Sequence, residues 1–415
     1  MTPPTFFEAL RFWTWLGFVS FGGPAGQIAT LHREVVQKKR WIAEGRFTHA
    51  LAYCTLLPGP EAQQLVTYIG WLLHGTLGGI VAGSLFVLPG LLVMIGLSAA
   101  YFTWGSVGPV AAAFAGVKPA VVAVVALAAW RVARRSLAGW PERLLALGAL
   151  IAVLLDVPFA ILIGVALLLG TQLPARPAAA HGKPASSASG PAPEASGFVL
   201  GEDDPPPPHA VPDARRLSAT LLVGVVLGVG TLLALPEGLA AMARFFTSAA
   251  FLTFGGAYAV LPYVHDGAVA HHWATSAQVV DGLALGETTP GPLILIVSFV
   301  GYAGAGVSGA LVATFFTFLP SFCFILLGAP FVERARTLPK LRGPMTAVSA
   351  AVVGVILHLA LRLGGNALFP DGRLDPVAVV VALVAGALLF RDRVGIVGVL
   401  VGAAVVGLGR SLLNI

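Results

Sequence analysis

The chain has 415 residues, of which 57% are hydrophobic and only 11% are charged. A soluble protein of this length has too little interior to hide so much apolar surface, so the composition excludes an ordinary soluble fold. The net charge of +6 comes from basic residues that cluster between apolar runs, which is typical of membrane topology and not of nucleic-acid binding.

The apolar runs predict an all-α polytopic membrane protein. A helix needs about 20 mainly apolar residues to cross about 30 Å of hydrocarbon. The clearest runs of that length are residues 76–104, 217–235, 307–328 and 393–413. Shorter and interrupted runs bring the expected total to about 10–13 membrane segments. Cys54 and Cys323 both lie in apolar runs, so neither a disulfide framework nor a zinc site is expected.

The chain divides into four parts. Residues 1–173 are interpreted as a first repeat and residues 236–415 as a second, with an extra crossing helix at 217–235. Residues 174–216 are rich in Pro, Ala, Ser and acidic residues. Such a composition cannot bury enough apolar area to fold, so it predicts a disordered cytoplasmic linker.

Matching motifs in the same order indicate an internal duplication. The segment "VSFGGPAGQI" at 19–28 matches "LTFGGAYAVL" at 252–261, and "ALAYCTLLPGP" at 50–60 matches "GLALGETTPGP" at 282–292. The offset between matched positions stays near 231–233 residues.

Loop charges predict that the two repeats have opposite orientations. In the first pair of matched loops, residues 32–46 carry five Lys or Arg and residues 263–277 carry none. In the second pair the bias is reversed, because residues 102–113 of the first half carry none and residues 331–343 of the second half carry four. By the positive-inside rule the basic loops face the cytoplasm, so the bias changes sides between the halves. The unmatched run 217–235 supplies the single extra crossing that inverts everything after it. The alternative is that this run pairs with a segment that the comparison of the halves does not reveal.

Each half also contains two interruptions of its apolar sequence. They are centred on Phe21-Gly22-Gly23-Pro24, Pro58-Gly59-Pro60, Phe254-Gly255-Gly256 and Pro290-Gly291-Pro292. Proline lacks an N–H and clashes with the preceding turn, so these stretches stop a helix, and exposed backbone at membrane depth must line a cavity or be buried in protein. We expect re-entrant hairpins, because inverted repeats with interrupted helices are typical of secondary transporters. The alternative is simple kinks in packed helices.

The interruptions predict an anion site near the membrane midplane. A half-helix that starts there presents free N–H groups and the positive end of its dipole. Glu61 and Glu287 flank the two Pro-Gly-Pro stretches, and Lys118, whose matched position is Ser349, is expected to be a lone cation near them. Three alternatives stay open: Lys118 snorkels to an interface, Glu61 caps a helix, and Gln63 binds backbone instead of an oxyanion.

The segments "FGGPAGQIATLHREVV", "YCTLLPGPEAQQLVTYIGW", "FLTFGGAYAVLPYV" and "ETTPGPLILIVSFVG" resemble the motifs of the chromate ion transporter family. The resemblance covers residues 6–173 and 238–413, as in its long, two-domain members. It implies a multi-pass protein of the bacterial inner membrane that exports chromate, gives chromate resistance, meets sulfate as a competing anion and needs no cofactor. Expected partners are therefore the anion and the lipid bilayer, with no nucleic acid; a homodimer stays open.

The resemblance and the breaks together define the candidate substrate-binding residues, with no catalytic or metal-binding residue among them. They are Gly22, Gly23, Pro24, Gln27, Pro58, Gly59, Pro60, Glu61, Gln63, Lys118, Gly255, Gly256, Glu287, Thr288, Thr289, Pro290, Gly291 and Pro292.

Other functions remain as alternatives. A sulfate or other oxyanion carrier is the first, because sulfate and chromate are tetrahedral dianions of similar size. A passive anion channel would share the same helix-terminus site. A membrane-embedded enzyme is disfavoured, because the chain has no Ser-His-Asp set at recognisable spacing, no His-Glu-x-x-His motif and no Walker-type phosphate loop.

Overall fold

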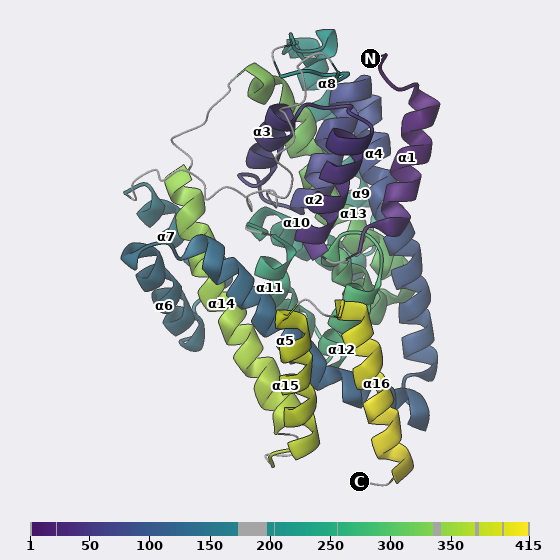
Figure 1. The fold of residues 1–415 in the computed structure, drawn as a ribbon, viewed down its shortest axis with the longest axis vertical. Helices are drawn as coiled ribbons and strands as arrows, with labels where there is room; N and C mark the ends of the chain where they lie inside the picture. Colours follow the sequence, from purple (N-terminus) through teal and green to yellow (C-terminus); the bar gives the residue numbers. More distant parts are fainter. Residues whose placement is uncertain are drawn as a thin grey trace.

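The computed structural model describes residues 2–21, 23–172, 197–202, 204–254, 256–334, 342–369, 373–391 and 394–413. Within these ranges the regular elements are helices, apart from one isolated parallel bridge between Ile42 and Leu200. The predicted all-α fold class is therefore confirmed. The long helices run roughly along the longest axis of the molecule, and the two termini lie at opposite ends of it (Figure 1).

The first half begins with a capped helix. Thr5 accepts a hydrogen bond from the backbone N–H of Glu8, and the Glu8 carboxylate accepts one from the N–H of Thr5, so α1 starts at Phe6. The helices of this half are α1 (Phe6–Val19), α2 (Gly23–His32), η1 (Arg33–Lys38), α3 (Glu44–Cys54), α4 (Glu61–Trp104), α5 (Gly108–Ser136), α6 (Trp140–Leu154) and α7 (Phe159–Gly170).

The second half follows a short helical turn, η2 (Pro208–Ala210). Asp213 caps the next helix by accepting a hydrogen bond from the N–H of Arg215. The helices from there on are α8 (Ala214–Val225), η3 (Val226–Gly230), α9 (Thr231–Ala234), α10 (Glu237–Leu252), α11 (Ala257–Ala270), α12 (Ser276–Thr288), η4 (Leu293–Leu295), α13 (Ile296–Arg334), α14 (Arg342–Leu368), α15 (Pro376–Phe390) and α16 (Ile396–Leu413).

The two longest helices, α4 and α13, each fold back on themselves. The backbone leaves helical geometry at His74–Gly75 in α4 and at Ala305–Gly306 in α13. Gly75 has a φ of 66° and Gly306 a φ of 60°, a left-handed conformation that glycine adopts without strain. The two bends lie 231 positions apart, which is the offset of the matched sequence motifs.

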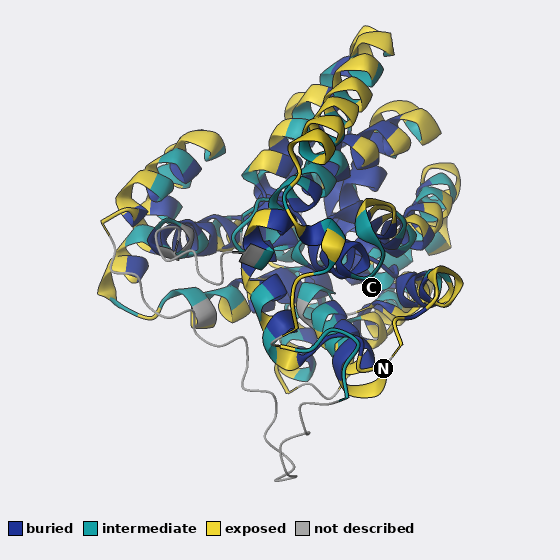
Figure 2. Ribbon diagram, turned by 90° about the horizontal axis from the view of Figure 1, so that it is seen from above, coloured by how far each residue is buried: buried dark blue, intermediate teal, exposed yellow. Residues whose placement is uncertain are grey.

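Within the described residues, six helices are long and apolar enough to cross a membrane: Glu61–Trp104, Gly108–Arg134, Ala214–Ala234, Leu293–Glu333, Thr346–Leu368 and Ile396–Leu413. Figure 2 shows buried residues gathered at the centre of the molecule and exposed residues on the peripheral helices, as expected for helices that face lipid. The segment Ala214–Ala234 contributes no buried residue to its most apolar window and covers nearly the same residues as the predicted extra crossing at 217–235. By contrast α2, α3, α11 and α12 have only 10 to 14 residues, too few to cross about 30 Å alone.

The halves pack on each other reciprocally. Helix α5 of the first half contacts α14, α15 and α16 of the second, and α14 contacts α5, α6 and α7. Each of the helices α5 and α14 therefore lies against the final helical pair of the other half. Gly116 on α5 and Gly407 on α16 approach each other closely, since a Cβ on Gly407 would lie 2.8 Å from the Gly116 Cα.

Substituting Gly407 by alanine is therefore expected to destabilise the protein. The new methyl group forces α16 away from α5, and such overpacking costs about 1–3 kcal/mol. The measurement is the melting temperature of detergent-solubilised protein, followed by size-exclusion chromatography. Gly402→Ala on the same helix is the matched control, because its Cβ meets nothing within 4 Å. Equal melting temperatures for the two variants would contradict the prediction.

The second arms of α4 and α13 cross in antiparallel directions. Gly79 lies against Leu326 and Gly83 against Phe322, so the residue number rises along α4 as it falls along α13. These two arms occupy matched positions of the two halves. A pair of matched helices that cross in opposite directions is the arrangement that a two-fold axis in the membrane plane produces.

The predicted disorder of the linker needs correction. Residues 173–196 lie outside the described ranges, but the chain from 197 onward is packed on the first half. Leu200 donates to the Trp41 carbonyl and accepts from the Ala43 N–H, and Ala210 is buried. His209 lies 2.8 Å from the Trp71 carbonyl. The composition of this segment could not predict its order, because the residues against which it packs lie far away in the sequence.

Candidate functional site

The first Pro-Gly-Pro break joins α3 to α4. Helix α4 starts at Glu61 directly after it, with Pro60 as cap residue. Glu61 is thus the first residue of the helix, and Pro60 occupies the N-cap position that the alternative assigned to Glu61. Gly59 has a φ of 129°, and its N–H donates to the Thr253 carbonyl of the second half over 2.7 Å.

The second break mirrors this contact. Gly291 has a φ of 89°, and its N–H donates over 2.8 Å to the carbonyl of Ser20. Ser20 and Thr253 are matched positions, since each comes three residues before the second glycine of the Gly-Gly pair. Each half therefore holds the Pro-Gly-Pro break of the other. Gln27 adds to this by donating from Nε2 to the Gly291 carbonyl over 2.6 Å.

These contacts correct part of the expected anion site. The N–H groups of Gly59 and Gly291 are used within the protein, so they do not face an anion. Gln63 donates from Nε2 to the Thr67 hydroxyl over 2.9 Å, and Gln64 donates to the Pro58 carbonyl over 2.8 Å, which favours the open alternative that these amides bind neighbouring protein groups. What remains for a ligand are the first N–H groups of the helices, which have no intrahelical partner, and side chains around the breaks.

Several buried polar atoms around the breaks have no hydrogen-bond partner among the described residues. They are Ser20 Oγ, Gln27 Oε1, Gln63 Oε1, Gln64 Oε1, Ser298 Oγ and Ser321 Oγ. A buried polar group without a partner costs about 1–3 kcal/mol, so such a gathering is typical of a site that a polar ligand or water completes. The serine hydroxyls can donate to oxyanion oxygens.

The start of α2 and the start of α11 approach the two glutamates. Tyr258 on α11 donates from its hydroxyl to Glu287 over 2.6 Å, and the same hydroxyl would lie 3.9 Å from a Cβ on Gly23. In the other half, a Cβ on Gly256 would lie 4.0 Å from Glu61 Oε1. Both carboxylates thus lie beside glycines at which a short helix begins.

The remaining candidates are placed as follows. Pro24 is the second residue of α2, and Pro292 caps η4. The Pro290 carbonyl lies against Gly90 of α4, so the second break is level with the middle of that arm. Thr288 and Thr289 donate to the Leu285 and Gly286 carbonyls, which ends α12. Gly22 and Gly255 lie outside the described residues.

Lys118 is not the lone cation that the sequence suggested. Its Nζ lies 3.8 Å from Oδ2 of Asp281, which also accepts a 2.7 Å hydrogen bond from the Tyr101 hydroxyl. Tyr101 is 11 residues beyond Gly90 on α4, so this cluster lies about 16 Å along the helix from the second break. Asp281 was missed, although a single acidic residue in the run "VVDGLAL" is a signal for an intramembrane functional group.

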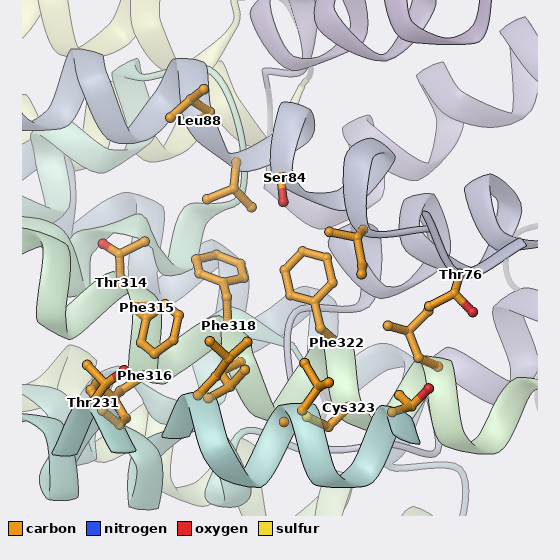
Figure 3. A pocket seen from close by; sticks show the side chains of 18 of the residues that line it. Thr76, Ser84, Leu88, Thr231, Thr314, Phe315, Phe316, Phe318, Phe322 and Cys323 are labelled. Atoms are coloured by element: carbon orange, nitrogen blue, oxygen red, sulfur yellow. The ribbon is translucent and has the colours of Figure 1, made fainter. Parts of the chain in front are cut away.

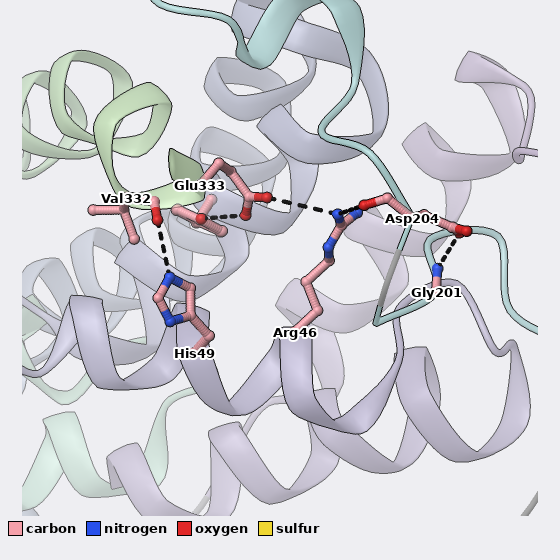
Figure 4. Close-up of polar contacts among 7 residues, drawn as sticks. Arg46, His49, Gly201, Asp204, Val332 and Glu333 are labelled. Carbon is pink, nitrogen blue, oxygen red and sulfur yellow. Dashed lines mark hydrogen bonds and ion pairs between the residues drawn. The ribbon is translucent and has the colours of Figure 1, made fainter. Parts of the chain in front are cut away.

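A second cluster around Glu333 was also missed. Glu333 accepts a 2.6 Å hydrogen bond from the Tyr68 hydroxyl, and its other oxygen lies 3.8 Å from Nη2 of Arg46. Figure 4 shows Arg46 between Glu333 and Asp204, whose carbonyl accepts a 2.7 Å hydrogen bond from the guanidinium. The sequence suggested only a topology signal for Arg46.

A third polar group joins three helices of the second half. His265 lies 2.9 Å from the Ser276 hydroxyl and 2.9 Å from the Asp266 carboxylate, which also pairs with Arg362 on α14. The structure thus brings together a serine, a histidine and an aspartate that the sequence did not relate. Since His265 is buried between α11 and α12, the contacts tie these helices to α14.

A large cavity of about 960 Å³ lies between α4, α8–α9 and α13. Figure 3 shows Phe315, Phe318 and Phe322 of α13 facing it, with Ser84 and Leu88 of α4 on the opposite wall. Among the described residues that line it, Arg216 is the one that is charged. This apolar chamber is unsuited to a dianion, so we place the candidate site at the Pro-Gly-Pro breaks.

Long apolar helices around a centre of broken, polar backbone define an integral membrane protein of the transporter type. The chain belongs to the chromate transporter family: the family profile "Chromate transporter" matches residues 7–171 and 240–408. No solved structure matches the chain.

Three similar proteins with names match along most of the chain. A protein of Pseudomonas aeruginosa named "Chromate transport protein" is 33% identical over 98% of this chain and 91% of its own length. A "Chromate transport protein" of Cupriavidus metallidurans is 29% identical, over 98% and 94% respectively. A "Probable chromate transport protein" of Synechococcus elongatus is 28% identical over 85% of this chain and 83% of its own length.

Proposed function

We propose that this protein is a secondary transporter that exports chromate from the bacterial cytoplasm across the inner membrane and so gives chromate resistance. The substrate passes between the two Pro-Gly-Pro breaks. The observation that carries the proposal is the reciprocal bonding of these breaks, in which Gly59 is held by Thr253 and Gly291 by Ser20. Each Pro-Gly-Pro break is thereby fixed against the residue that precedes the Gly-Gly interruption of the other half.

The chemistry of that point supports a tetrahedral oxyanion. Buried hydroxyls of Ser20 and Ser321 can donate to an anion. Helix α2 begins three residues after Ser20, and α4 begins two residues after Gly59, beside which Ser321 lies, so positive dipole ends are close to both hydroxyls. The family and the names of the full-length relatives favour chromate over sulfate, which has the same charge and shape. Sulfate transport is the second candidate, because this donor set does not distinguish the two anions.

The test is uptake of radiolabelled chromate into everted membrane vesicles, with and without an uncoupler and with sulfate as competitor. Accumulation that the uncoupler abolishes is the expected result, and inhibition by sulfate would indicate a shared dianion site. Equilibration without accumulation would indicate a channel. If the vesicles transport sulfate but not chromate, the protein is a sulfate carrier.

We also propose that the two halves have inverted topology, with residues 32–46 in the cytoplasm and 263–277 outside. Gln37 and Ala277 are exposed positions in or beside these loops and serve as reporters. In a background without Cys54 and Cys323, Gln37→Cys is expected to react with an impermeant thiol reagent only in everted vesicles, and Ala277→Cys only in right-side-out vesicles. Reaction of both from the same side contradicts the inversion.

A further inference from the structure

Two polar clusters with the same chemistry lie outside the Pro-Gly-Pro centre. In the first, the Asp281 carboxylate accepts from the Tyr101 hydroxyl and lies 3.8 Å from the Lys118 ammonium. We call this the outer cluster, because Tyr101 directly precedes the segment 102–113, which carries no basic residue and contains the turn between α4 and α5.

In the second, the Glu333 carboxylate accepts from the Tyr68 hydroxyl and lies 3.8 Å from the Arg46 guanidinium. We call this the inner cluster, because Arg46, at the start of α3, belongs to the basic segment 32–46. In both clusters the carboxylate comes from the second half of the chain, whereas the tyrosine and the cation come from the first. Both carboxylate side chains are only 5% exposed.

The clusters occupy matched places in the two halves. The outer one joins α12 to the end of α4, and the inner one joins α3 to the end of α13. Helices α3 and α12 are the matched segments that precede the two Pro-Gly-Pro breaks. Each cluster is therefore connected to a break through one short helix.

The distance between the clusters is close to the thickness of a membrane. Helix α4 folds back at Gly75, so its first arm lies beside its second arm, with Thr67 against Gly79 and Gly83. Measured along the axis of the second arm, Tyr68 is therefore at about the height of residue 82. Tyr101 lies about 20 residues further along the arm, or about 30 Å. The second break contacts Gly90 and therefore lies between the two levels.

We propose that the outer and inner clusters are the two gates of the transport pathway, of which only one opens at a time. Each closed gate holds a buried carboxylate with a tyrosine and a cation from the other half, and opening separates the halves at that end. Since a buried charge that loses its partner is strongly unfavourable, opening both ends together is disfavoured. The role as gates of this pathway rests on the function proposed above.

The experiment measures access to the centre from each side. Ser321 is buried beside Gly59, and Ser321→Cys in a Cys54→Ala, Cys323→Ala background supplies a reporter thiol there. An impermeant thiol reagent is applied to right-side-out and to everted vesicles without chromate. Asp281→Asn is expected to raise the rate of labelling from outside at least tenfold and to lower it from inside. Glu333→Gln is expected to do the reverse.

Asp375→Asn is the matched control, because Asp375 is also a carboxylate with a basic partner, Arg410, and its side chain is only 10% exposed, but it joins α15 to α16. It is expected to leave both rates unchanged. If Asp281→Asn and Glu333→Gln each raise the labelling rate from both sides, the whole protein has become less rigid and the proposal is overturned. Labelling rates that do not change would also overturn it. The labelling needs no substrate, so its result is independent of chromate. If the labelling rates shift in opposite directions but the protein with its natural Ser321 shows no chromate flux, the two gates are supported and chromate as the substrate is rejected.

Discussion

Replacing Gly59 by alanine is expected to reduce chromate accumulation at least tenfold. Gly59 has a φ of 129°, and a Cβ there would lie 2.6 Å from the Gln64 amide nitrogen and collide with the Ser321 hydroxyl. Strain of this kind costs about 1–3 kcal/mol before the collision is counted. The chain must shift, and the bond from the Gly59 N–H to Thr253, which holds the break against the other half, is lost.

The measurement combines uptake into everted vesicles with the melting temperature of the purified protein. Gly96→Ala is the matched control on α4, because its Cβ meets nothing within 4 Å. Gly291→Ala is expected to do less harm than Gly59→Ala, because its nearest neighbours would be 3.4 Å away and only the φ of 89° is unfavourable. Adding Ser321→Ala to Gly59→Ala removes the collision and should restore part of the stability. Wild-type accumulation by Gly59→Ala would remove the break from the transport site.

Local sequence signals predicted much of the fold. Pro-Gly-Pro stops a helix wherever it occurs, so the start of α4 at Glu61 was expected from Pro58-Gly59-Pro60 alone. Hydropathy predicted the extra helix within a few residues, because a helix that packs on little protein must be apolar all round. The bend at Gly75 was not singled out, since one glycine within an apolar helix does not reveal that the chain reverses there.

The partners in the polar clusters were beyond prediction from local pattern. Lys118 and Asp281 are 163 positions apart, and Arg46 and Glu333 are 287 apart. No periodicity connects such positions, so Lys118 was interpreted as a lone cation and Arg46 as a topology signal. The ordered chain after residue 197 was missed for the same reason, because the Trp41 and Ala43 backbone that binds it lies about 160 residues earlier.

Glu287→Gln is expected to abolish chromate accumulation while leaving the fold and the binding of chromate intact. Glu287 is 4% exposed and accepts a 2.6 Å hydrogen bond from Tyr258 beside the start of α2. Glutamine has nearly the same shape and its carbonyl can accept the same hydrogen bond, so the melting temperature should change by only a few degrees. Its amide carries no charge and cannot take up or release a proton.

That difference isolates the electrostatic role of the carboxyl group. A carboxylate next to the path of a dianion repels it, so the dianion passes only when the carboxyl group is protonated or displaced. We therefore expect Glu287→Gln to bind chromate at least as tightly as the natural protein in isothermal titration, but to show no uncoupler-sensitive accumulation in everted vesicles. Glu142→Gln, at a buried carboxyl group on α6, is the control and should accumulate chromate normally. Accumulation of chromate by Glu287→Gln at the natural level would show that Glu287 serves only as a hydrogen-bond acceptor for Tyr258. Another group would then have to couple chromate transport to the energy of the membrane gradient.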